Sequence, residues 1–169
     1  SGKSTLFKSI LGLVEPDTGR ISINKESVDR IRKYVSYIPQ KEEIDWSFPA
    51  TILDVVLMGR YPHHAVFDRL EKEDYDKAHR SLEQMGILDL KHKQIGELSG
   101  GQQQRAFIAR ALCQEAEIYL LDEPFVGVDI TTEGRIIEIV QALAEQGKLV
   151  IIIHHDLAKV KEYFDRLIM

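Results

Sequence analysis

Two short apolar segments in the second half of the chain constrain the fold most. Residues 117–121 and 149–153 are nearly continuous runs of apolar side chains, which are typical of strands buried on both faces of a parallel sheet. Between them, residues 131–146 carry apolar side chains at helical spacing. Strands that alternate with helices in this way predict an α/β fold with a parallel sheet.

The remaining segments extend this alternation around a helical block. The sequence patterns predict further helices over residues 3–11, 51–60, 71–85, 103–114 and 156–164, and further strands over residues 20–24, 34–39 and, cut short, 166–169. We therefore expect a single domain in which an α/β core, residues 1–40 and 115–169, is interrupted by a helical subdomain, residues 41–114.

Composition excludes several classes of protein. The chain has 169 residues, 44% of them hydrophobic and 29% charged, which is typical of a soluble globular domain. Its net charge of −5 argues against a nucleic-acid partner. The single cysteine, Cys113, excludes an internal disulfide, and we expect it to be a small core residue on a helix. No apolar run approaches the roughly 20 residues of a membrane span, so we expect a cytoplasmic chain.

The first residues, Ser1-Gly2-Lys3-Ser4-Thr5, match the closing half of a phosphate-binding loop, G-x-x-x-x-G-K-[ST]. The first glycine of that loop is not in the sequence, so we expect a fragment of a longer chain. Backbone N–H groups at the start of the following helix would point at phosphate oxygens. Lys3 can reach the β- and γ-phosphates, and the Ser4 hydroxyl suits a Mg²⁺ ion.

Polar residues follow the predicted strands, at the edge where open α/β sheets bind ligands. Asp122 and Glu123 end one strand, His155 ends another, and Gln40 follows the strand over residues 34–39. Two adjacent carboxylates repel, so a cation such as Mg²⁺ bound to ATP should offset them. His154 should point the opposite way from His155 and be structural.

A second candidate phosphate site precedes the helix over residues 103–114. Its Ser99 hydroxyl and the N–H groups of Gly100 and Gly101, followed by Gln102, can bind phosphate oxygens at a helix start.

These motifs, in this order, resemble the ATP-binding cassette (ABC) ATPases over nearly the whole chain. The resemblance implies a P-loop NTPase core, with Thr5 near the α-phosphate and Mg²⁺ held by Ser4, Gln40 and Asp122. It also implies that Glu123 deprotonates the attacking water and that His155 contacts the γ-phosphate. By the same resemblance Gln40 is a third catalytic residue, which touches the attacking water and acts as the hinge of the helical block.

The same resemblance implies a head-to-tail dimer with two ATP molecules between its subunits, either a homodimer or a pair of ABC ATPases. The Ser99–Gln102 stretch would then cap the nucleotide of the second subunit, and Asp129 falls where the family has an inter-subunit aspartate. A membrane permease would be the partner, and a periplasmic or lipoprotein solute-binding protein an indirect one. The subunit would lie peripherally on the cytoplasmic face of the bacterial inner membrane.

Two segments bear on the cargo. Residues 45–49 and 53–61, together with His154-His155-Asp156, resemble the ATPases of bacterial manganese, zinc and iron importers. Residues 59–63 also resemble siderophore and haem importers, so that class stays open. In the family the surface just after Gln40 receives a helix of the permease, and Trp46, Phe48 and Tyr61 either anchor that helix or pack inside the helical block.

Other interpretations of the function remain open. A DNA-repair or ribosome-associated ABC ATPase is the non-transport alternative, although the chain lacks the long coiled coil of the repair type and has Leu157 where ribosome-associated relatives usually have Arg. A nucleotide-binding module without hydrolysis is disfavoured because Lys3, Glu123 and His155 are present. A histidine metal site is also disfavoured, and we expect the remaining histidines to be exposed: His63, His64, His79 and His92.

Overall fold

A computed structural model describes residues 2–23, 25–41, 44–46, 48–65, 68–155, 163–166 and 168. Its main sheet consists of three parallel strands in the order β3-β4-β5, namely β3 (Val35–Ile38), β4 (Ile118–Asp122) and β5 (Leu149–Ile153). Val35 lies opposite Ile118, which lies opposite Leu149, so the three strands run in step to the same edge. The predicted α/β fold with a parallel sheet is therefore confirmed.

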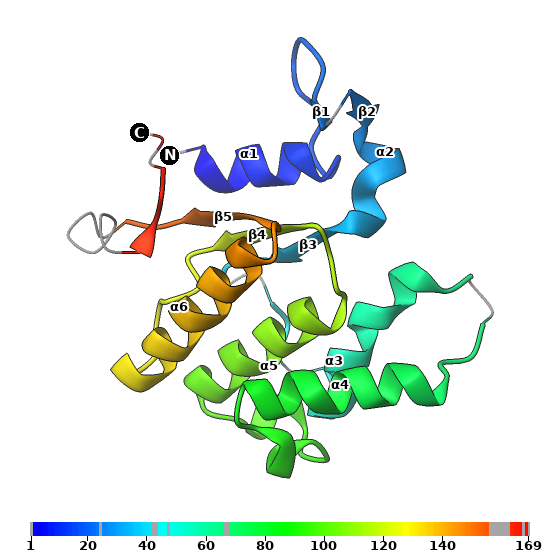
Figure 1. Cartoon of the computed structure of the whole chain (residues 1–169), viewed down its shortest axis with the longest axis vertical. Coiled ribbons are helices and arrows are strands. Elements are labelled where there is room, and N and C mark those ends of the chain that lie inside the picture. Colours follow the sequence, from blue (N-terminus) through cyan, green and yellow to red (C-terminus); the bar gives the residue numbers. More distant parts are fainter. Residues whose placement is uncertain are drawn as a thin grey trace.

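Both faces of this sheet are covered (Figure 1). Side chains alternate along β4, so Ile118 and Leu120 join Phe7 and Leu11 at helix α1 (Lys3–Ile10). Tyr119 and Leu121 face the other way, into a larger core that includes helices α5 (Gly100–Cys113) and α6 (Ile130–Glu145). This two-sided burial explains why the strand reads as one apolar run.

The segment between β3 and β4 is helical. It contains α3 (Ile52–Leu57), the 3₁₀ segment η3 (Met58–His63), α4 (Lys72–Gln84) and two short 3₁₀ turns, η4 (Leu88–Leu90) and η5 (Ile95–Glu97), before α5. Thr51 caps α3 because its hydroxyl accepts from the Asp54 N–H at 3.2 Å. Val56, Leu82 and Met85 are fully buried between these helices.

Small elements connect α1 to the sheet. A two-stranded antiparallel ribbon, β1 (Ser22–Ile23) and β2 (Glu26–Ser27), is followed by the short helix α2 (Val28–Ile31) and the 3₁₀ turn η1 (Arg32–Tyr34). The strand expected over residues 20–24 is thus shorter than predicted. Within the described part of the chain, every helix is too short or too polar to cross a bilayer.

Two predicted helices begin or end differently. The helix expected from residue 103 begins at Gly100, because Ser99 and Gln102 cap it reciprocally: the Ser99 N–H donates to Gln102 Oε1 at 3.0 Å, and the Gln102 N–H to Ser99 Oγ at 3.3 Å. The helix expected over residues 51–60 changes to 3₁₀ geometry after Leu57, near Pro62, which cannot donate to the helix ladder.

Other expectations are confirmed or lie outside the described residues. Cys113 is buried on α5 with 1% exposure, as predicted, and burial raises the pKa of its thiol to about 11. The helix expected from Asp156 falls largely outside the described residues, and so does most of the strand expected over residues 166–169.

Candidate functional site

Four predicted polar residues meet at the carboxyl edge of the sheet. Asp122 is the last residue of β4 and Glu123 follows it, while Gln40 and His155 each lie two residues beyond the ends of β3 and β5. Gln40 Nε2 donates to Asp122 Oδ1 at 3.5 Å, and His155 Nδ1 lies 3.6 Å from Glu123 Oε2. Both contacts are at or beyond the outer limit of a hydrogen bond.

Asp122 is buried but only half satisfied. The residue is 1% exposed, and among the described residues its Oδ2 atom has no hydrogen-bond partner. An unpaired buried carboxylate oxygen costs roughly 1–3 kcal/mol or more, so such an atom calls for an explanation. A hard cation with oxygen ligands supplies one, because Mg²⁺ is usually bound by one or two carboxylates together with substrate phosphates. The residues present therefore fit a Mg²⁺ ion.

Glu123 sits on a sharp bend at the strand end. Its φ of 52° lies in the left-handed region, which costs a non-glycine residue roughly 1–2 kcal/mol. The backbone N–H of Glu123 donates to the Ile153 carbonyl at 3.1 Å, which ties the bend to β5. The neighbouring His155 is exposed, whereas His154 is half-buried and lies edge-on to Phe125 at 5.3 Å. The two histidine rings nevertheless lie near each other, with their centroids 5.6 Å apart, so they differ in burial but do not separate as simple alternation along a strand predicts.

The phosphate-binding residues begin helix α1. Gly2 adopts a left-handed φ of 77° and Lys3 starts the helix, so the amides of this first turn have no acceptor within the helix. Lys3 and Thr5 are exposed and Ser4 is half-buried. Figure 1 shows α1 running in the opposite direction to β5, so the start of α1 and the carboxyl end of β5 point to the same side. Ser1 lies outside the described residues.

The Ser99–Gln102 stretch is not part of this cluster. Within the described residues, no hydrogen bond or ion pair joins it to Asp122, Glu123 or His155. Instead a side chain at Gly100 would collide with the Lys41 ammonium group, and one at Gly101 would lie 3.8 Å from Asp129 Oδ2. Asp129 caps α6 by accepting from the Thr132 N–H at 3.0 Å.

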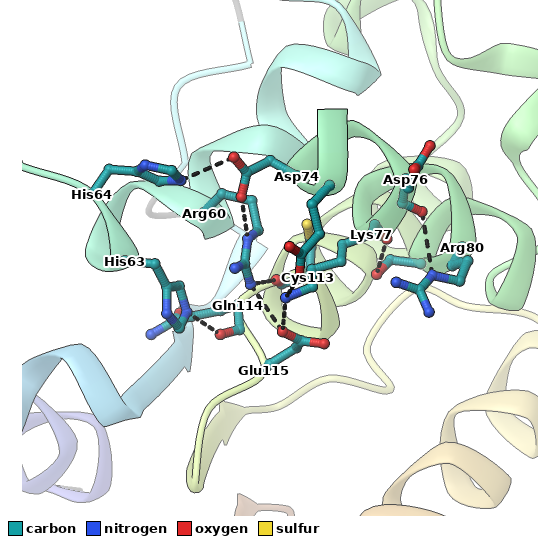
Figure 2. Close-up of polar contacts among 12 residues, drawn as sticks. Arg60, His63, His64, Asp74, Asp76, Lys77, Arg80, Cys113, Gln114 and Glu115 are labelled. Carbon is teal, nitrogen blue, oxygen red and sulfur yellow. Dashed lines mark hydrogen bonds and ion pairs between the residues drawn. The ribbon is translucent and has the colours of Figure 1, made fainter. Parts of the chain in front are cut away.

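Sequence reasoning missed a second polar cluster, a buried network in the helical block (Figure 2). Arg60 Nε donates to Asp74 Oδ1 at 2.9 Å, and His64 Nε2 lies 2.9 Å from Asp74 Oδ2. The Arg60 and Asp74 side chains are only 6% and 5% exposed. Burial raises the pKa of Asp74, but hydrogen bonds from the Glu71 N–H, Arg60 and His64 outweigh it and lower that pKa to about 2.

The network continues to the end of α5. Arg60 Nη1 donates to the Cys113 carbonyl at 2.8 Å and to Glu115 Oε2 at 3.2 Å, and Lys77 Nζ lies 2.7 Å from Glu115 Oε2. Hydrogen bonds to Glu115 and Glu73 raise the pKa of Lys77. Burial raises the pKa of Glu115, but Lys77 outweighs it and the net shift is downward. These charges neutralise one another, which suits a structural role.

The predictions for the histidines are confirmed at two positions and wrong at two others, and the three aromatic residues also differ in exposure. His63 and His92 are exposed, as expected, but His64 and His79 are half-buried beside Asp74 and Lys91. No group of three metal-binding side chains occurs in the described residues. Of the three aromatic residues, Trp46 lies against Phe107 at 5.2 Å, whereas Phe48 and Tyr61 are exposed by 55% and 58%.

Comparison with known proteins gives relatives over the whole chain. A sequence profile described as "ABC transporter" matches residues 1–126. The manganese transport system ATP-binding protein MntB of Halalkalibacterium halodurans is 50% identical over 169 residues, covering 100% of this chain and 67% of that relative. The chelated iron transport system membrane protein YfeB of Yersinia pestis is 45% identical over 171 residues, covering 100% of this chain and 58% of YfeB.

Solved structures agree with the fold. A nucleotide-free ATP-binding cassette from an ABC transporter matches with a TM-score of 0.80 and 28% identity, covering 98% of this chain and 70% of the other. A dimeric ATP-binding cassette in a post-hydrolysis state, bound to ADP and Pi, matches with a TM-score of 0.78 and 25% identity over 93% of this chain and 71% of the other.

Proposed function

Because the chain belongs to the ABC transporter family and carries its ATPase domain, we propose that it is the motor subunit of a metal-ion importer. The observation that carries this proposal is the meeting of Gln40, Asp122, Glu123 and His155 at one edge of the sheet. Manganese and iron are favoured by the names of the relatives. Zinc is included as a possible cargo only because of the sequence resemblance.

We assign the nucleotide phosphates to the start of α1, where Lys3 and the helix amides would offset their negative charge. Ser4, Gln40 and Asp122 would hold Mg²⁺, which when bound neutralises charge on the β- and γ-phosphates. The unpaired Asp122 oxygen supports this set, since cation binding would satisfy an atom that the protein leaves without a partner.

Hydrolysis needs a base beside the γ-phosphate. Glu123 would accept the proton of the attacking water, a role worth roughly 10²–10⁴-fold in rate. His155 Nδ1 already faces the Glu123 carboxylate, which leaves Nε2 for the γ-phosphate. The tied backbone bend at Glu123 would hold this carboxylate in place while water attacks.

The Ser99–Gln102 stretch lies apart from these residues, which supports a role toward the nucleotide of a second subunit. We propose a head-to-tail dimer, or a pair with another ABC ATPase, in which Asp129 also lies at the interface. The dimeric state of one solved relative supports the dimer as such. In it, residues 41–114 would act as a helical subdomain and residues 1–40 and 115–169 as the core.

Transport would need a membrane permease at the cytoplasmic face of the bacterial inner membrane, with a solute-binding protein delivering the metal outside. The exposed Phe48 and Tyr61 are candidates for permease contacts, because large exposed apolar side chains serve as interface anchors. The alternative is a siderophore or haem importer. Uptake of radioactive manganese, iron or haem by proteoliposomes holding the assembled transporter separates these cargoes.

The site itself is tested by nucleotide binding with and without Mg²⁺. We expect Mg²⁺ to tighten ATP binding by the wild-type protein, and Asp122→Asn to lose most of that gain while keeping metal-free binding through Lys3. Isothermal titration calorimetry with ATP, in Mg²⁺ and then in EDTA, measures both. If the ATP affinity of the wild-type protein were the same with and without Mg²⁺, the assignment of the Mg²⁺ site would be contradicted.

A further inference from the structure

Strand β3 has an outer edge with no neighbouring strand among the described residues. The Tyr34 carbonyl accepts from the Glu117 N–H at 3.0 Å and so points toward β4. Because carbonyl directions alternate along an extended chain, those of Val35 and Tyr37 in β3 point away from β4, to the outer edge. Unpaired backbone groups at such an edge need partners.

Two side chains at the end of α5 supply the partners, one from Arg110 in the helix and one from its C-cap residue, Gln114. Arg110 Nη2 donates to the Tyr37 carbonyl at 2.7 Å. Gln114 Nε2 donates to the Val35 carbonyl at 3.0 Å and approaches the Lys33 carbonyl at 3.3 Å. Four helical residues rise about 6 Å and two strand residues about 6.6 Å. The spacing of Arg110 and Gln114 on the helix therefore matches that of Tyr37 and Val35 on the strand.

These bonds join two elements that carry functional residues at their far ends. Strand β3 leads directly to Gln40, and α5 begins at Ser99 and Gly100. Ser99 lies about 16 Å along the helix axis from Arg110, so a 10° tilt of α5 about its bonded end would move the loop by about 3 Å. A shift of 1 Å in a catalytic group can cost on the order of 100-fold in rate.

We propose that Arg110 and Gln114 are positioning residues of the ATPase, which hold α5 in register with β3 and thereby fix the Ser99–Gly101 loop relative to Gln40. The assignment rests on the proposed function, in which both ends act on ATP. Neither side chain needs to touch nucleotide, because each acts through the element that it joins.

Kinetics of the assembled transporter test this role. We expect Gln114→Met and Arg110→Met to lower kcat about tenfold while the KM for ATP changes less than twofold, because the Lys3 end of the site is untouched. Arg110→Lys keeps one cationic donor and should restore part of the loss.

The matched control is Gln103→Met. Gln103 lies on the same helix, is buried, and donates Nε2 to the Ile95 carbonyl at 3.2 Å, within the helical block rather than to β3. The Gln103→Met variant also loses one side-chain hydrogen bond to a carbonyl, so its free energy of unfolding should fall about as much as that of Gln114→Met. Its kcat per folded molecule should stay within twofold of wild type. Equal kcat values for Gln114→Met and Gln103→Met would overturn the proposal.

A distance measurement decides the anchoring without ATP turnover. Spin labels at two exposed positions, Glu83 on α4 and Glu138 on α6, report how the helical block sits on the sheet. We expect the nucleotide-free distance distribution to widen about twofold in Gln114→Met and Arg110→Met and to stay unchanged in Gln103→Met. Unchanged widths in all three would refute the anchor, whereas a wild-type protein without ATPase activity would refute only the proposed function.

Discussion

The two polar clusters of this protein are built in opposite ways. In the helical block, Arg60 and Asp74 lie 2.9 Å apart and are almost fully buried, and each has further partners. At the sheet edge, the contacts between Gln40 and Asp122 and between His155 and Glu123 are 3.5 and 3.6 Å long. One buried oxygen of Asp122 lacks any hydrogen-bond partner in the described part of the chain.

This difference separates scaffold from site. Charges that satisfy one another hold a shape, because removing either partner leaves a buried group uncompensated. Groups left incomplete can take up a ligand that completes them. The lowered pKa of Asp74 and the raised pKa of Lys77 both belong to the satisfied network. Perturbed pKa values are often taken as markers of active sites, but those of Asp74 and Lys77 belong to the scaffold.

The largest effect should come from the incomplete cluster. We expect Glu123→Gln to lower ATP turnover by roughly 10²–10⁴-fold, since an amide cannot accept the proton of the attacking water. ATP binding should persist, and a closed dimer should accumulate in ATP on size-exclusion chromatography.

Glu117→Gln is the matched control for that change. Glu117 precedes the same strand at its opposite end, is exposed, and pairs with Lys148 at 2.7 Å. Its turnover should stay within about twofold of wild type, as expected for a surface ion pair. Near wild-type turnover by Glu123→Gln would remove that residue from the role of base.

Breaking the satisfied cluster should affect stability instead. We expect Arg60→Met to lower the free energy of unfolding by about 3–5 kcal/mol, because it leaves Asp74 buried without its main cationic partner. Urea denaturation measures this. Arg30→Met, which removes an exposed pair with Glu26 at 3.3 Å, should cost no more than about 0.5 kcal/mol. Similar losses from both would mean that Arg60 is not a scaffold residue.

Acid should weaken the same network. The pKa of Asp74 is about 2 in the folded protein, against 3.8 for an unperturbed aspartate. The stability that its charge contributes is therefore fully present above about pH 4 and is lost as the pH falls toward 2. We expect the difference in unfolding free energy between wild type and Asp74→Asn to shrink over that interval in urea titrations. A difference that stays constant from pH 6 to pH 2 would disprove the charge effect.

The smallest effect concerns the close packing of Gly59, the residue before Arg60, against helix α5. A side chain at Gly59 would collide with the Arg110 carbonyl and lie 3.2 Å from the Gln114 nitrogen, so Gly59→Ala should cost about 1–2 kcal/mol. Gly134 on α6 has open space around it, and Gly134→Ala should stabilise by up to about 1 kcal/mol. Differential scanning calorimetry should show melting temperatures that move in opposite directions, and a shared direction would contradict the packing.

The sequence predicts the sheet edge far better than the network. Asp122 ends an apolar strand, and Gln40 and His155 each follow one closely. Parallel neighbouring strands bring these ends to one edge of the sheet, independently of the conformation of the loops. Arg60 and Glu115 come together only through the packing of η3, α4 and α5, and no local pattern encodes a contact between positions so far apart. The sequence predicts an exposed His64 because no local pattern shows that it packs beside Asp74, which lies on helix α4.

The start of α5 shows a subtler limit. Two glycines predict a loop, because glycine disfavours helix interiors, yet the reciprocal bonds between Ser99 and Gln102 begin the helix at Gly100. The S-x-x-Q spacing of a capping box was the signal that could have revealed it.

The left-handed backbone at Glu123 has a consequence for anyone who evolves this protein in the laboratory. A selection for heat resistance alone would reward Glu123→Gly or Glu123→Asn, since both residue types tolerate that conformation and would relieve the bend. The selected variants would be more heat-stable but would lack the carboxylate that we assign as the base in ATP hydrolysis. Thermal stability and ATPase activity therefore favour different residues at this position.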